Sequence, residues 1–85
     1  MSPVGALVGD IARALADHPE QVAVTETDHR GLTLIEIYMA EGDLGRVIGR
    51  QGRTANAVRL LAAVAAEQHG RKVQVEFRDG VPPVR

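Results

Sequence analysis

The stretch "GRVIGRQGRT", residues 45–54, combines three glycines with three arginines and holds no acidic residue. Leu44, Val47 and Ile48 precede Gly49 at helical spacing, and a second apolar run with helical character starts near residue 52 or 53. Glycine adopts reversing conformations at little steric cost. The stretch therefore predicts two helices joined by a glycine-bounded loop, residues 49–52.

This loop has the chemistry of a site for a sugar–phosphate backbone. A loop without Cβ atoms at its ends lets a backbone approach main-chain N–H groups closely. The second helix directs its unpaired N–H groups and its positive dipole end to the same place. Arg50 is expected at the loop tip, with Arg46 and Arg53 within one turn of it, and guanidinium groups suit phosphate oxygens.

Two other glycine-rich phosphate motifs are excluded by the spacing. A P-loop needs glycine at position 47 and lysine at position 53, directly after a strand. Val47 and Arg53 occupy these positions, and a helix is expected before the loop. A dinucleotide fingerprint would also need glycine at position 47.

The rest of the chain predicts one small α+β domain, residues 1–79, followed by a short flexible tail, residues 80–85. A first helix starts at Ser2-Pro3 and ends before Pro19. Alternating segments predict strands over 21–27, 32–40 and 72–77, with a turn at 28–31 and a helix from about 53 to 69. The order is α-β-β-α-α-β. In the second strand Leu32 and Leu34 lie opposite the main apolar face, which indicates either a bulge or a contact with something else.

Charge and composition favour some functions over others. The chain has 85 residues and a net charge of −1, but residues 1–45 carry −6 and residues 46–85 carry +5, so a local basic surface can exist on an acidic molecule. Tyr38 and Phe77 are the only aromatic residues, which argues against RNA-binding folds that stack bases on aromatic platforms. The absence of cysteine and of a long apolar run fits a cytoplasmic protein.

The sequence offers no set of residues for catalysis. The one serine, Ser2, is expected to cap a helix, and the three histidines, His18, His29 and His69, are not spaced as a metal pair. We therefore expect no enzyme activity, no cofactor and no metal.

The segment "DLGRVIGRQGRT", residues 43–54, together with the short N-terminal helix resembles the KH domain, in its bacterial type II arrangement. Over residues 3–79 the chain is most similar to very small single-KH RNA-binding proteins of the KhpA or YlqC type. By this resemblance the loop clamps about four nucleotides of single-stranded RNA or DNA. It implies these RNA-binding residues: Arg46, Val47, Ile48, Gly49, Arg50, Gln51, Gly52 and Arg53. Val47 and Ile48 would form one wall of an apolar groove, which Thr54 and Ala55 would make shallower than in many KH motifs.

The same resemblance implies a cellular role. The family is regarded as RNA chaperones that pair with a KhpB (Jag-type) protein and are linked to cell length and peptidoglycan homeostasis. A module that only binds proteins, with the arginines serving solubility, is the alternative.

The helix over residues 54–69 suggests a second contact surface. Its apolar residues cover an arc of about 240°, far wider than the stripe of about 100° that one core needs. Leu60, Leu61 and Val64 lie in the excess arc and predict a partner interface, in a homodimer or a heterodimer with a KH protein. Alternatively, the alanines of this segment simply favour an exposed helix.

Overall fold

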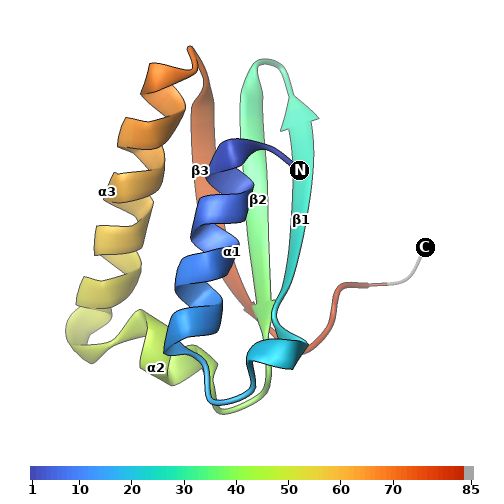
Figure 1. The fold of residues 1–85 in the computed structure, drawn as a ribbon, viewed down its shortest axis with the longest axis vertical. Helices are drawn as coiled ribbons and strands as arrows, with labels where there is room; N and C mark the ends of the chain where they lie inside the picture. Colours follow the sequence, from blue (N-terminus) through green and yellow to red (C-terminus); the bar gives the residue numbers. More distant parts are fainter. Residues whose placement is uncertain (84–85) are drawn as a thin grey trace.

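In the computed structural model, which describes residues 1–83, the helices α1 (Pro3–Leu15) and α3 (Arg53–Gln68) cover one face of a three-stranded sheet (Figure 1). The strands β1 (Ala23–His29), β2 (Leu32–Met39) and β3 (Lys72–Asp79) lie in that order, β1 antiparallel and β3 parallel to β2. Three shorter elements complete the chain: the 3-10 turns η1 (Pro19–Gln21) and η2 (Arg50–Gly52), and the helix α2 (Leu44–Ile48). The predicted order α-β-β-α-α-β and the one-sided packing of the helices are confirmed.

The core lies between the central strand and the helices. On β2, alternate residues Ile35, Ile37 and Met39 are completely buried, because successive side chains of a strand point to opposite faces. The helices meet them with small aliphatic residues at spacings of four: Val4, Val8 and Ala12 on α1, and Val58, Ala62 and Ala66 on α3. These short side chains allow the helices to lie close to the sheet.

The start of α1 is tied to β1. Ser2 caps the helix by accepting the amide of Gly5 at 3.0 Å, and its hydroxyl donates to Glu26 Oε1 at 2.6 Å. Gly9 faces β1, where an added Cβ would lie only 3.0 Å from Val24 Cγ2. A glycine in this helix therefore costs some helix propensity but lets α1 approach the sheet closely.

The β1–β2 hairpin differs from the sequence prediction in its boundaries. The predicted strand 21–27 is wrong by two residues at each end, because η1 uses Gln21 and the ladder continues to the pair His29–Leu32. Asp28 remains in the strand since its carboxylate accepts hydrogen bonds from Thr33 at 2.7 Å and Arg71 at 3.1 Å. The pairing of β1 with β2 runs without interruption, so no bulge accounts for Leu32 and Leu34.

The chain after α3 turns at Gly70 (φ 65°) into β3. This strand extends two residues beyond the predicted 72–77, because Tyr38 and Met39 supply partners for Arg78 and Asp79. Residues 80–83 of the predicted tail form neither helix nor strand, and residues 84–85 lie outside the described part. None of the helices within residues 1–83 is both long enough and apolar enough to span a bilayer.

Candidate nucleic-acid interface

The backbone of the loop between α2 and α3 requires glycine at position 49 and favours it at position 52. Gly49 has φ 72° and ψ −179°, a region that essentially only glycine adopts. Gly52 has φ 71° and ψ 13°, and Gln51 between them is also left-handed at φ 58°. A Cβ on Gly49 would lie 2.5 Å from Thr54 Oγ1, so the side chain of Thr54 occupies the space that glycine leaves. In the sequence Thr54 stands out only as a departure from the KH motif, and nothing there indicates this packing.

The backbone N–H groups at the tip of this loop are candidate hydrogen-bond donors to a polar ligand. The amides of Gly49 and Gly52 donate to the carbonyls of Gly45 and Gly49. Within residues 1–83, no hydrogen bond of the turns, loops and helix caps uses the amide of Arg50 or Gln51, and both residues are exposed. The residue that precedes α3 is Gly52, which has no side chain to cap the helix. The loop tip and the positive end of α3 thus expose donors in one small region.

Buried contacts hold the loop from below. Val47 on α2 and Ala55 on α3 are in the core, so both helices that flank the loop are anchored there. Asp43 precedes α2 and is also buried; its carboxylate accepts the backbone N–H of His18 at 2.8 Å and lies 3.3 Å from the His18 ring Nδ1. Because this contact joins residues 25 positions apart, it leaves no local signal in the sequence.

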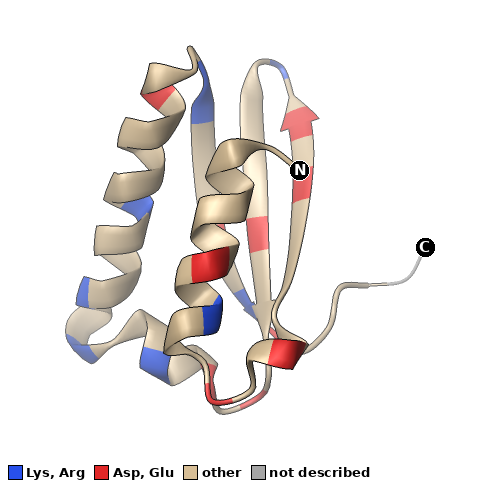
Figure 2. Ribbon diagram, viewed as in Figure 1, with Lys and Arg blue, Asp and Glu red and all other residues tan. Residues whose placement is uncertain are grey.

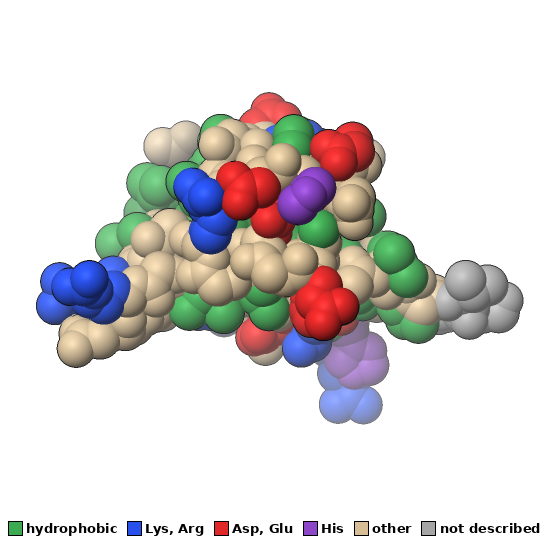
Figure 3. Space-filling view, turned by 90° about the horizontal axis from the view of Figure 1, so that it is seen from below, with side chains coloured by type: hydrophobic (Ala, Val, Ile, Leu, Met, Phe, Trp, Pro, Cys, Tyr) green, Lys and Arg blue, Asp and Glu red, His purple; other side chains and the backbone are tan. Residues whose placement is uncertain are grey.

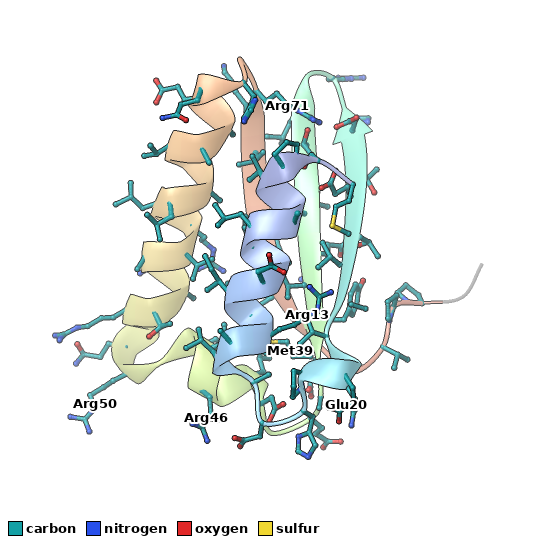
Figure 4. All side chains as sticks on the ribbon, in the orientation of Figure 1. Arg13, Glu20, Met39, Arg46, Arg50 and Arg71 are labelled. Atoms are coloured by element: carbon teal, nitrogen blue, oxygen red, sulfur yellow. The ribbon has the colours of Figure 1, made fainter. Side chains whose placement is uncertain are left out.

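The arginines around the loop are in different electrostatic situations. Arg50 points away from the body of the molecule (Figure 4). Arg53 donates to the side-chain oxygen of Gln51 at 3.3 Å. No carboxylate of the described residues forms an ion pair with either of these arginines, whereas Arg46 is paired with Asp17 at 3.0 Å.

The basic end of the molecule borders an acidic surface. On the ribbon, basic positions follow one another through α2, the loop and the first turns of α3, while the connection that follows α1 is acidic (Figure 2). Seen from this end, Lys and Arg side chains gather at one tip, and acidic and histidine side chains lie nearer the middle (Figure 3). The predicted local basic surface therefore exists in this protein of net charge −1.

The two residues expected to wall an apolar groove face different ways. Ile48 is 37% exposed beside the loop, but Val47 is completely buried in the core. Adjacent helical residues are about 100° apart, so a short helix that packs on the core cannot present both. The expectation that Val47 lines an open groove is thus wrong for this structure; Val47 supports α2 from beneath.

The loop is a protrusion and not a pocket. An open depression of about 490 Å³ lies at the other end of the molecule, where Ala63 and Glu67 of α3 meet Leu32, Lys72 and Val73. Within residues 1–83, no three His, Cys, Asp or Glu side chains come together as a metal site would require. A protruding loop with exposed amides suits a long ligand that passes over it.

Comparison with known proteins shows the family of the chain. The family model described as "KhpA/KhpB, KH domain" matches residues 6–77. A protein named RNA-binding protein KhpA from Halalkalibacterium halodurans is 44% identical over 73 residues, which are 86% of this chain and 96% of the relative. The protein of the same name from Treponema pallidum is 38% identical over 73 residues, covering 86% and 91% of the two chains.

Among solved structures, Era in complex with MgGDPNP and nucleotides 1506–1542 of 16S ribosomal RNA has a TM-score of 0.63 and 23% identity. An Era variant from Aquifex aeolicus gives 0.62 and 21%. Both likenesses cover 94% of this chain, which spans only 30% and 31% of those longer chains, so they show the fold alone. With the family model covering most of its length, the chain belongs to the KhpA/KhpB KH-domain family.

Proposed function

We propose that this chain binds single-stranded RNA by gripping the phosphate backbone with residues 49–52. One observation carries the proposal: the loop tip is exposed at the N-terminal end of α3, and its two arginines, Arg50 and Arg53, have no carboxylate partner within residues 1–83. Arginine and main-chain N–H groups are the donors that phosphate oxygens accept from. The names of the KhpA relatives agree with an RNA ligand.

The site favours backbone contact over base recognition. Ile48 is the one member of the predicted apolar wall that reaches the surface, and the flanking position 55 is a buried alanine. A single module with so few contacts binds weakly, and a second linked module raises affinity through effective concentration. We therefore also propose that the exposed residues Leu60, Leu61 and Val64 of α3 bind a second copy of this chain.

The family resemblance extends the proposal to the cell. We propose that the protein acts in the cytoplasm as an RNA chaperone or post-transcriptional regulator, with a KhpB-type partner, in processes that govern cell shape and peptidoglycan. If a KhpB-type protein and not a second copy binds α3, sedimentation of the chain with and without that protein will detect it.

The experiment is a titration of a short fluorescent single-stranded RNA with wild type, Arg50→Asp and Arg30→Asp. Arg30 is a matched control, because it is an exposed arginine in the hairpin turn, away from the loop, and the substitution changes the net charge equally. A charge-assisted hydrogen bond contributes about 1.5–3 kcal/mol. Arg50→Asp should therefore weaken binding by about tenfold or more, and Arg30→Asp by less than about twofold.

The salt dependence adds a second criterion. Loss of one phosphate contact should reduce the slope of log K against log salt by about 0.7 for a single strand. Equal affinity and equal slope for the two variants would contradict loop binding and favour the alternative of a module that binds only proteins.

A further inference from the structure

An ion pair joins the connection after α1 to the basic end of the molecule. Arg46 Nη1 lies 3.0 Å from both carboxylate oxygens of Asp17. Both side chains remain accessible, at 60% for Arg46 and 56% for Asp17. Of the three arginines in residues 45–54, Arg46 is the one with a carboxylate partner in the described part of the chain. It points from α2 toward the same end of the molecule as Arg50 (Figure 4).

The fold holds Asp17 next to α2. The next residue, His18, donates its backbone N–H to the buried carboxylate of Asp43 at 2.8 Å, and Asp43 directly precedes α2. A part-buried hydrogen bond thus joins the backbone segments on both sides of the ion pair. An exposed ion pair usually contributes little to stability, because its long side chains are free and solvated. Here the hydrogen bond keeps the two backbone segments adjacent, so that the two side chains stay within reach of each other.

A carboxylate in this position competes with a phosphate. Both groups are anions that offer Arg46 two oxygen acceptors. A phosphate that approaches Arg46 must replace Asp17 or remain beside its negative charge, within the screening distance of about 8 Å at physiological salt. Arg50 and Arg53 present no such competitor within residues 1–83.

We propose that Asp17 lowers the affinity of the site for an RNA backbone by holding Arg46, and that it marks the edge of the RNA footprint on the α1 side. The proposal rests on the RNA binding proposed above. Asp17 is a positioning residue, since it acts through Arg46 and does not itself contact the phosphates. The strand accordingly follows Arg50 and Arg53 and leaves Arg46 at its margin.

A purely structural role for the pair would have a different signature. If the pair only pinned the connection after α1 to α2, removal of the carboxylate would lower the thermal unfolding temperature and leave RNA affinity unchanged or weaker. The proposal instead expects tighter binding when the acid is removed.

The test compares Asp17→Asn with Asp10→Asn in the full chain, with the same RNA oligonucleotide. Asp10 is a matched control, because it is an exposed acid that pairs with an arginine, Arg13, at 3.5 Å, on α1. Asp17→Asn should tighten binding by about three- to tenfold and steepen the salt slope by about 0.7, as one added phosphate contact would. Asp10→Asn should change affinity by less than about twofold, and Asp17→Glu, which keeps the acid, should remain close to wild type.

An Arg46→Gln background isolates the mechanism. In the Arg46→Gln protein, Asp17→Asn should change the affinity for RNA no more than Asp10→Asn does. Equal effects of the two acid-to-amide changes in the wild-type background, or a gain that persists in Arg46→Gln, would overturn the inference alone. Absence of RNA binding by wild type, or insensitivity to Arg50→Asp, would instead overturn the proposed function and the inference with it.

Discussion

Gly49 connects local backbone geometry to the proposed function. Its dihedral angles and the position of Thr54 Oγ1 both exclude a side chain. The consequence is a sharp reversal that leaves the next two residues, Arg50 and Gln51, exposed at the loop tip. Replacement of this residue therefore tests the shape of the loop without any change of charge.

We expect Gly49→Ala to destabilise the protein by about 1–3 kcal/mol, because a non-glycine residue is strained in this conformation, and to weaken RNA binding. Gly45→Ala is the matched control: Gly45 lies in α2 and an added Cβ meets nothing within 4 Å. Alanine there should stabilise the helix by about 0.5–1 kcal/mol. Denaturant unfolding of both variants measures the difference; equal stabilities would show that the loop relaxes around a side chain.

Individual residues also show what the sequence could predict about the site. The spacing of Gly49 and Gly52 was enough to predict the loop, since glycine patterns report local backbone conformation. The burial of Val47 and the pairing of Arg46 with Asp17 depend on how α2 sits on the core and on the connection after α1. Contacts between residues 29 positions apart leave no local signal in a single sequence.

At the level of elements, helix α3 has apolar residues on two faces. Its inner face packs on the sheet, and its outer face carries Leu60, Leu61 and Val64 at 66%, 54% and 49% exposure. The prediction of an apolar arc too wide for one core is confirmed by these exposures. A partner on this face stays a proposal, and the next experiment tests it.

We expect the wild-type chain to sediment as a dimer and Leu60→Glu to sediment as a monomer, because a carboxylate buried between two helices without a partner is strongly unfavourable. Leu7→Glu, on α1 and 40% exposed, is the control and should remain dimeric. Sedimentation velocity over a range of concentrations measures both variants, alone and with a KhpB-type protein. A monomeric wild type that Leu60→Glu leaves unchanged would contradict self-association through α3. Association only with the KhpB-type protein would assign the face to that partner.

Element boundaries show the limit of reading strands from local pattern. The existence and order of the α-helices and strands were predictable, since apolar periodicity and glycine or proline positions mark them, but the 3-10 helices η1 and η2 were not predicted. The ends of β1 and β3 could not be predicted, because they depend on pairing with β2. Asp28 pairs with Thr33, and Asp79 pairs with Met39. A polar residue remains in a strand when the neighbouring strand satisfies it.

For the whole molecule, the arrangement of charge is more informative than its sum. The fold brings Arg46, Arg50 and Arg53 to a tip formed by α2, the loop and the start of α3, while the acidic connection after α1 borders it (Figure 2). A polyanion responds to the local potential and not to the net charge of −1. The hairpin turn between β1 and β2, at the other end of the sheet, lies far from that tip (Figure 1).

The most direct measurement is an NMR titration of ¹⁵N-labelled protein with a short single-stranded RNA at low salt. The account predicts that the amides of Arg50, Gln51 and the first turn of α3 shift in proportion to bound RNA, while Gly31 in the β1–β2 turn does not. Shifts confined to the outer face of α3 or to the sheet, with the amides of residues 49–53 unchanged, would contradict the central claim.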